Sequence, residues 1–319
     1  MPIVTPAGYD SIRIPVKSTP IVILDNLGQF TLDNRNPLFD RLSQHLLDKP
    51  IPVYTEYIFD DSVKNLYPNL DLRFSFDEHV KCAYFESFQE YVTPDQLAFK
   101  NFLCSFNGES SHVGRRLLVA IIKKFNYYHR DYVSKNLTFT VDELDGHIVD
   151  ICGEHERFYR KFFISSDSET FFQETNNFDY QRLDHLHNVR ALGTKINESF
   201  IHVVSDAIST SNYPFYGEKF LYSVVNKGLF VSNAQVNWHR NLEKYYGFKP
   251  YTKLFDYRFD SIVNPIRRLV ELMTMLSKFG HLSIDEWHDL YRIELDTIEF
   301  NYDHYRSRRY LECLKQWAN

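Results

Sequence analysis

The sequence predicts an α/β protein with two domains and mainly parallel sheets. Short apolar runs that have the character of buried strands alternate with longer segments of helical periodicity, within residues 20–76 and again within 100–269. The chain has 319 residues, 44% of them apolar, which is enough for two domains of ordinary size. We expect an N-terminal domain over 1–98, a second domain over 99–285 and a C-terminal helix over 286–319 that could pack back on the first domain.

The first domain contains one readable β-α-β unit. PIVIL (20–24) predicts a short buried strand, LFDRLSQHLL (38–47) has its apolar residues on one helical face, and IPVYTEYIF (51–59) alternates like a strand. LDLRFSF (70–76) continues the pattern less clearly. The Thr-Pro pair at 93–94 is a break signal and predicts the edge of this domain.

The second domain begins with a strand, a turn and a helix. KNFLCSF (100–106) predicts the strand, and NGESS (107–111) predicts the turn. HVGRRLLVAIIKKF (112–125) has helical periodicity, and Ser110 or Ser111 is its expected N-cap.

A second β-α-β unit follows after a stretch that is hard to interpret. The chain between 129 and 198 is rich in charged and aromatic residues, and its pattern predicts no more than one or two helices. SFIHVVSD (199–206) then predicts a strand, EKFLYSVVNK (218–227) a helix, Gly228 a left-handed helix stop and LFVSN (229–233) a strand.

Helices dominate the rest of the chain. They are predicted over 237–248, over 263–280 and over 283–319, the last as one long helix or two. Ser283 and Glu286 have the spacing of a capping box at the start of the last segment.

The composition narrows the class of protein. The formal net charge of −6 and the pI near 6.1 disfavour a protein that coats nucleic acid through a basic surface, but they leave room for a local basic groove. The four cysteines have neither metal-binding nor disulfide-framework spacing, which fits a reducing compartment. No signal peptide is recognisable, and no apolar run approaches the roughly 20 residues that span a bilayer. We expect a soluble, cytoplasmic protein with no membrane association.

Two strand-loop-helix turns carry cations where the helix backbone is already positive. Arg115 and Arg116 lie in the first turn of one predicted helix, and Lys219 lies in the first turn of another. A cation there is disfavoured by about 0.3–1 kcal/mol, whereas a bound phosphate reverses the balance and gains charge-assisted hydrogen bonds. The alternative is that each cation points into solvent. Neither turn carries the P-loop or the dinucleotide-binding fingerprint.

The stretch from SFIHVVSD to NPIRRL (199–269) resembles the C-terminal half of a family of glycosyltransferase-like proteins of phages and large viruses, related in pattern to fucosyltransferases. In that pattern an acidic residue follows a VVS-like strand, a Glu-Lys pair opens a helix, and a glycine-containing strand precedes a segment that ends in GF. FLCSFNGESSHVGRRLLVAI (102–121) likewise resembles the family's first strand-loop-helix motif. The likeness covers about half of the chain.

This resemblance implies an architecture of GT-B type, in which two Rossmann-like domains face one cleft and the C-terminal domain holds a nucleotide-sugar. Carried over by position, Asp206 and Glu218 would contact the nucleotide-sugar, while Lys219 with Arg115 or Arg116 would neutralise its diphosphate. Asp206 stands where the family usually has glutamate, and the first motif lacks the family's arginines. A non-catalytic nucleotide-binding or protein-interaction module is the alternative that these departures leave open.

The implied reaction moves a sugar from a UDP-sugar or a similar nucleoside-diphosphate sugar to a hydroxyl, with no metal or other cofactor. The chain has no Asp-x-Asp at the end of an apolar strand, and the acidic segment 167–169 is predicted to be a solvated loop. A general base is sought among carboxylates at strand ends of the first domain, namely Asp25 and Asp61, whose commoner role is to cap a turn or a helix.

The acceptor is the least constrained part of the prediction. Arg157, Phe158, Arg160 and Lys161 mix cations with an aromatic ring and could contact nucleic acid, although such rings more often fill a core. Because the resemblance points to phages and viruses, the expected acceptor is double-stranded DNA with hydroxymethylated pyrimidines, and the expected location is the host cytoplasm. Glycans and proteins are the alternative acceptors.

Overall fold

The computed structural model of the chain describes most of residues 97–317 and shorter stretches before them. The described residues are 3–5, 21–23, 35, 37–44, 50–55, 58–59, 61–74, 85–86, 88–89, 91, 97–107, 113–128, 131–135, 138–152, 156–175, 185–206 and 216–317.

The strands among these residues form two separate sheets, and every strand pair is parallel. The order is β1-β2-β3-β4 in the first sheet and β6-β5-β7-β8 in the second. The strands are β1 (Ile3–Thr5), β2 (Ile21–Ile23), β3 (Ile51–Thr55), β4 (Leu70–Phe74), β5 (Asn101–Asn107), β6 (Tyr132–Lys135), β7 (Ser199–Val204) and β8 (Leu229–Ser232). The predicted α/β class with parallel sheets is therefore confirmed.

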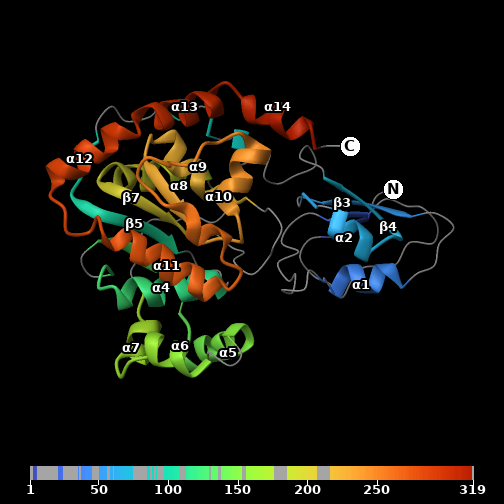
Figure 1. The fold of residues 1–319 in the computed structure, drawn as a ribbon, viewed down its shortest axis with the longest axis horizontal. Coiled ribbons are helices and arrows are strands. Elements are labelled where there is room, and N and C mark those ends of the chain that lie inside the picture. Colours follow the sequence, from blue (N-terminus) through green and yellow to red (C-terminus); the bar gives the residue numbers. More distant parts are fainter. Residues whose placement is uncertain are drawn as a thin grey trace.

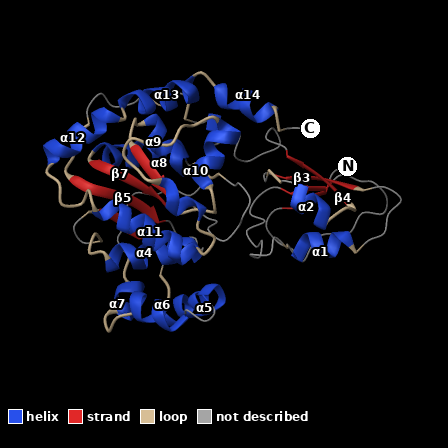
Figure 2. Cartoon of the chain, viewed as in Figure 1, coloured by secondary structure: helices blue, strands red, loops and turns tan. Residues whose placement is uncertain are grey.

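Helices flank both sheets, and Figure 2 shows the strands grouped in two places with helices beside them. Those beside the first sheet are α1 (Pro37–Ser43) and α2 (Asp61–Leu66). Those of the second unit are α4 (Val113–Lys124), α5 (Val141–Cys152), α6 (Glu156–Phe163), α7 (Ser168–Gln173), α8 (His185–Asn197), α9 (Lys219–Val225), α10 (Trp238–Asn241) with a π-helix η3 (Leu242–Tyr246), a 3₁₀ turn η4 (Tyr257–Ser261) and α11 (Pro265–Ser277). None of the described helices is long and apolar enough to cross a membrane.

The first unit has a small core on one face of its sheet. β3 and β4 bury every second residue, which is the pattern of a sheet with one covered face. The ring of Phe39 in α1 packs edge-on against Phe59 at 5.7 Å and Tyr67 at 5.3 Å. Val63 of α2 is fully buried. The alternation expected from IPVYTEYIF thus holds over β3.

The second sheet is covered on both faces. β5, β7 and β8 bury nearly every residue, as expected for parallel strands between two helical layers. In Figure 1, α4 and α11 lie on one side of this sheet, and α8 and α9 lie on the other. The carboxyl ends of these strands are the place where doubly covered parallel sheets bind ligands.

The stretch between 129 and 198 contains more structure than its pattern predicts. Its described residues include the edge strand β6 and the four helices α5 to α8. The prediction of a solvated loop at 167–169 is wrong, because Ser168 is buried and begins α7. Asp167 is exposed as expected, and its carboxylate pairs with Lys123 at 2.8 Å.

The prediction that Gly228 ends α9 in the left-handed conformation is also wrong. The left-handed residue is Lys227, with φ of 54°. Gly228 donates its N–H to the carbonyl of Ser223 at 2.8 Å, and a Cβ added to it would lie 2.6 Å from Cγ2 of Ile196 in α8. Glycine is needed here for close packing between two helices rather than for its backbone freedom.

The C-terminal region forms three helices rather than one or two. They are α12 (Ile284–Ile293), α13 (Leu295–Arg306) and α14 (Arg309–Lys315). The predicted capping box of Ser283 and Glu286 is confirmed. α13 contacts α9, and α14 contacts η3, so both cover the second unit (Figure 1).

The C-terminal helices also hold a segment from the first third of the chain, the docking segment, whose described residues are 85, 86, 88, 89 and 91. Arg306 donates hydrogen bonds to the carbonyls of Gln89 and Tyr91, the latter at 3.2 Å. The docking segment packs in turn on α9, where Phe85 meets Phe220 at 5.9 Å and Phe88 meets Tyr222 at 5.3 Å. The C-terminal helices therefore contact residues of the range 1–98, while the domain boundaries stay a prediction.

Candidate functional site

A row of polar residues lies at the carboxyl ends of the strands of the second sheet. Asn107, the last residue of β5, pairs with Lys135, the last residue of β6. The registers of β5 with β7 and of β7 with β8, continued to the strand ends, place Ser205 and Asn233 level with Asn107. Residues that are level on neighbouring parallel strands point to the same face of the sheet. We call Asn107, Ser205 and Asn233 the polar row.

The polar row is buried and incompletely hydrogen-bonded. No member is more than 2% exposed. The amide of Asn107 donates to the carbonyl of Ser134 at 3.2 Å, and that of Asn233 donates to the carbonyl of Gly114 in α4 at 3.4 Å. The side-chain oxygens of all three have no hydrogen-bond partner within the described part of the chain. A buried polar atom without a partner lowers the stability of the fold by about 1–3 kcal/mol. We therefore expect a ligand or ordered water to bind these oxygens.

Lys135 lies level with the polar row, but its side chain makes hydrogen bonds within the fold. Its ammonium donates hydrogen bonds to the carbonyls of Phe172, at 3.0 Å, and of Glu174, at the end of α7. Burial lowers the pKa of Lys135 to about 8. These bonds tie β6 to α7 and leave the oxygens of the polar row to other partners.

The structure brings Lys219 and Arg115 together from opposite faces of the sheet. Lys219 begins α9, and Arg115 lies in the first turn of α4 and is 6% exposed. The pKa of Lys219 falls to about 8, because the ammonium is desolvated and because the Arg115 guanidinium is near. Like charges that are held close in a poorly solvated place favour the binding of an anion between them.

Two carboxylates accompany these cations. Glu218 and Asp206 both raise the pKa of Lys219, but by less than desolvation and Arg115 lower it. Asp206 is 3% exposed, and its Oδ2 accepts hydrogen bonds from the indole of Trp238 at 3.3 Å and from the N–H of Gly217 at 3.5 Å. Four of the residues expected to hold a nucleotide-sugar thus lie together, namely Arg115, Asp206, Glu218 and Lys219.

Arg116 points elsewhere. Its guanidinium pairs with Glu143 at 3.0 Å and contacts Nε2 of His147 at 3.0 Å, both in α5. It also lies 5.7 Å from the ring centre of Phe139. The two candidate arginines are therefore distinguished by their partners: Arg115 is near Lys219, and Arg116 joins α4 to α5.

Two buried histidines near the polar row have structural roles. His239 uses both ring nitrogens, since Nε2 accepts the N–H of Ser232 at 3.0 Å and Nδ1 donates to the carboxylate of Asp260 at 2.9 Å. His202 bonds Ser223 at 2.6 Å, and its pKa is lowered to about 3 by burial and by the charge of Lys219. Both ring nitrogens of His239 are thus used within the fold, and the lowered pKa of His202 leaves that ring neutral near pH 7.

The other predicted site residues do not join the cluster around Lys219. Asp25 lies outside the described residues, and Asp61 is the exposed first residue of α2, beside the first sheet. The residues predicted to contact an acceptor all belong to α6, which packs on α4 and α5 in a layer beyond α4 as seen from the second sheet (Figure 1). Those residues are Arg157, Phe158, Arg160 and Lys161.

On α6 the predicted contact residues form an exposed surface. Phe158 is 63% exposed and stacks on Phe162 at 6.3 Å. Arg157 and Lys161 are exposed, and Arg160 pairs with Asp145 of α5. The aromatic ring of Phe158 is therefore available to a partner rather than part of the core.

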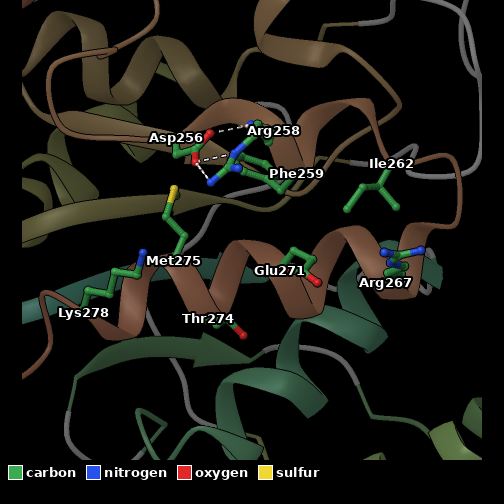
Figure 3. A pocket seen from close by; sticks show the side chains of 9 residues that line it. All are labelled: Asp256, Arg258, Phe259, Ile262, Arg267, Glu271, Thr274, Met275 and Lys278. Carbon is green, nitrogen blue, oxygen red and sulfur yellow. Dashed lines mark hydrogen bonds and ion pairs between the residues drawn. The ribbon is translucent and has the colours of Figure 1, made fainter.

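A separate pocket lies between η4 and α11. It has a volume of about 360 Å³, and Figure 3 shows η4 and the residues next to it on one side and α11 on the other. Asp256 and Arg258 pair across its upper rim in that view. None of the predicted site residues lines it. Within the described residues no group of three histidine, cysteine or acidic side chains comes together that could hold a metal ion.

The sequence prediction passed over Ser205 and Asn233, although the signal for them was present. Each directly follows a buried strand of a parallel sheet, and the carboxyl ends of such strands meet at one edge. What the sequence lacks is the register, which alone shows that they lie level with Asn107.

Comparisons of the chain with protein-family models, with curated proteins and with solved structures find no match.

Proposed function

We propose that the protein is a glycosyltransferase that moves a sugar from a nucleoside-diphosphate sugar to a hydroxyl acceptor. The observation that carries the proposal is the proximity of Lys219 and Arg115 at the carboxyl edge of a doubly covered parallel sheet, beside buried oxygens that have no partner within the described residues. A diphosphate between these cations would relieve the repulsion between them. The two parallel sheets would then be the two Rossmann-like domains of a GT-B enzyme, with the nucleotide on the second.

The proposed chemistry follows from the charges. The acceptor oxygen attacks the anomeric carbon, the bond from that carbon to the phosphate oxygen breaks, and the diphosphate leaves with the electron pair. Lys219 and Arg115 stabilise the negative charge that builds on the leaving group, so these two residues supply the electrostatic part of catalysis. The proton of the acceptor hydroxyl passes to a carboxylate on the side of the first sheet, for which Asp61 and Asp25 are the candidates.

Binding of nucleotides to substituted proteins tests the donor site. Calorimetry with UDP, GDP and their hexose conjugates should detect a ligand whose affinity falls by about tenfold or more in Lys219→Met and in Arg115→Gln. Arg116→Gln is the matched control, because the same change one residue along α4 removes a guanidinium that faces α5. Circular dichroism checks that each variant is folded.

The outcomes separate the alternatives. Loss of affinity in the first two variants and retention in the control supports the donor site. No binding by the parent protein, or equal loss in Arg116→Gln, contradicts it. Binding without sugar transfer to any acceptor would instead identify a non-catalytic nucleotide-binding module.

The proposed acceptor is duplex DNA with hydroxymethylated pyrimidines, with α6 as a contact surface. Support comes from the exposed ring of Phe158 between Arg157 and Lys161, a combination that suits stacking on a base beside a phosphate. Mass spectrometry of hydroxymethylated and unmodified duplexes after incubation with the donor should show added hexose on the former alone. Transfer to free sugars or to protein instead would replace DNA as the acceptor.

A further inference from the structure

The polar row presents acceptor atoms that a diphosphate cannot satisfy. An amide Oδ1 accepts hydrogen bonds and donates none, and a diphosphate near neutral pH offers almost no donors. Of the three row oxygens that have no partner in the described part of the chain, two are of this kind, those of Asn107 and Asn233. The group that completes the polar row must therefore carry O–H or N–H donors.

The distance between the three side chains of the polar row limits which chemical group can bind all of them. Neighbouring parallel strands lie about 4.8 Å apart, so the three side chains span about 10 Å across β5, β7 and β8. A hexose carries hydroxyl donors on opposite edges of its ring, and a hydrogen bond of about 2.8 Å at each edge lets it reach acceptors that lie farther apart than the ring is wide. A nucleobase offers one or two donors along a single edge, which matches three separate acceptors less well.

The position of the row places this group beside the proposed diphosphate site. Asn233 bonds the carbonyl of Gly114, which directly precedes Arg115 in α4. Ser205 directly precedes Asp206, whose carboxylate interacts with Lys219. A ligand whose diphosphate lies between Arg115 and Lys219 can therefore reach the row with the group attached to that diphosphate.

We propose that Asn107, Ser205 and Asn233 form the subsite that binds the hydroxyl groups of the donor sugar. This inference rests on the proposed function and adds a specificity site to it. The side chains act as acceptors for the sugar hydroxyls, and the bonds that they make with backbone carbonyls hold the two amides in position.

Ser205→Ala is the sharpest test, because the Oγ that it removes has no partner within the described chain. Calorimetry compares UDP-glucose with UDP, and GDP-mannose with GDP, on the full chain. For the sugar nucleotide that binds the parent, we expect affinity to fall by about three- to tenfold, while affinity for the matching nucleoside diphosphate stays unchanged. Asn233→Ser serves as a second variant and should act in the same direction.

Ser134→Ala is the matched control. Ser134 also has a buried Oγ without a partner in the described chain, but it lies in the edge strand β6 and one residue before the level of the row, so it faces the other side of the sheet. This variant should leave both affinities unchanged. Thermal unfolding should show no loss of stability in Ser205→Ala, since the removed hydroxyl makes no hydrogen bond to any described residue.

Two results overturn the inference. Unchanged affinities in Ser205→Ala and Asn233→Ser would mean that buried water satisfies the row. Equal losses for the sugar nucleotide and for its nucleoside diphosphate would assign the row to the nucleoside. Failure of the proposed function looks different, because then neither sugar nucleotide binds the parent, or binding survives Lys219→Met.

Discussion

Lys219 is held in a place that costs the free protein stability. Its ammonium loses water on folding, and Arg115 repels it, while Asp206 and Glu218 only partly compensate. Natural proteins keep such unfavourable groups mainly where they bind or react with a ligand. The stability of the ligand-free protein therefore reports directly on this residue.

Lys219→Met should raise the free energy of unfolding of the ligand-free protein by about 1–3 kcal/mol near pH 7. The pKa of Lys219 is about 8 in the folded protein, against 10.5 for a lysine in an unfolded chain. Below the lower value both states are protonated and the full cost is present. Between the two values the unfolded chain binds more protons, so the cost disappears as pH rises. Urea unfolding near pH 7 and near pH 10 should show a smaller gain at the higher pH, and an equal gain would contradict the desolvation of Lys219.

The sequence indicates the pair of turns that carries the cations but not which arginine takes part. Arg115 and Arg116 are neighbours, and consecutive residues on a helix point about 100° apart. Only the position of α5, with Glu143 ready to bind Arg116, decides between them. α5 lies between residues 129 and 198, where the charged and aromatic residues show no clear helical pattern. The choice between the two arginines therefore required the structure.

At the scale of elements, glycine has a different role at each of two positions. Gly228 lies where α8 approaches the end of α9, and a Cβ there would meet Ile196 at 2.6 Å. Gly146 lies in the interior of α5, where an added Cβ meets nothing within 4 Å. The first is required by packing, and the second only weakens its helix.

Alanine substitutions at these positions should therefore have opposite signs. Gly228→Ala should lower the free energy of unfolding by about 1–3 kcal/mol, because the contact with Ile196 forces two helices apart. Gly146→Ala should raise it by about 0.5–1 kcal/mol through better helix propensity. Urea unfolding of both variants provides the measurement. A neutral Gly228→Ala would show that α8 can move aside without cost.

The elements that the sequence predicts are those with a single dominant period. β5, β7, β8, α4 and α11 have buried runs or one apolar face, and each lies within a predicted range, except that β5 continues one residue further, to Asn107. β6 has four residues, and the last is a buried lysine. Its composition therefore does not indicate a strand. α6 does separate its charged residues from its aromatic ones with helical spacing, but it has only eight residues within a long charged and aromatic stretch, so a single-helix pattern there is short.

At the scale of the whole molecule, the docking segment and the C-terminal helices hold each other. Arg306 gives hydrogen bonds to backbone carbonyls of the segment, Gln89 gives one to the carbonyl of Tyr305 at 3.0 Å, and the Tyr305 hydroxyl gives one to Phe85. None of these contacts is local in sequence, and backbone carbonyls carry no residue signature. Such an attachment cannot be predicted from a pattern of apolar residues.

Arg306→Ala should lower the free energy of unfolding by about 1.5–3 kcal/mol, the usual worth of hydrogen bonds from a charged donor. Hydrogen exchange of the amides in the docking segment should speed up at the same time, while exchange in β5 and β7 changes much less. Arg309→Ala is the control, because Arg309 is exposed and lies in the same region. Equal effects of the two variants would contradict the role of Arg306.

The docking segment can make its bonds to Arg306 only late in the synthesis of the chain. Its bonds with Arg306 join residues that are 215 to 218 positions apart. On a translating ribosome the docking segment emerges long before Arg306 and Tyr310, so a nascent chain that pauses ahead of residue 306 leaves the segment's carbonyls and one side of the Phe85 ring without their partners. Folding intermediates of that kind are the ones that chaperones retain, so slow translation between these points should increase the dependence of the protein on them.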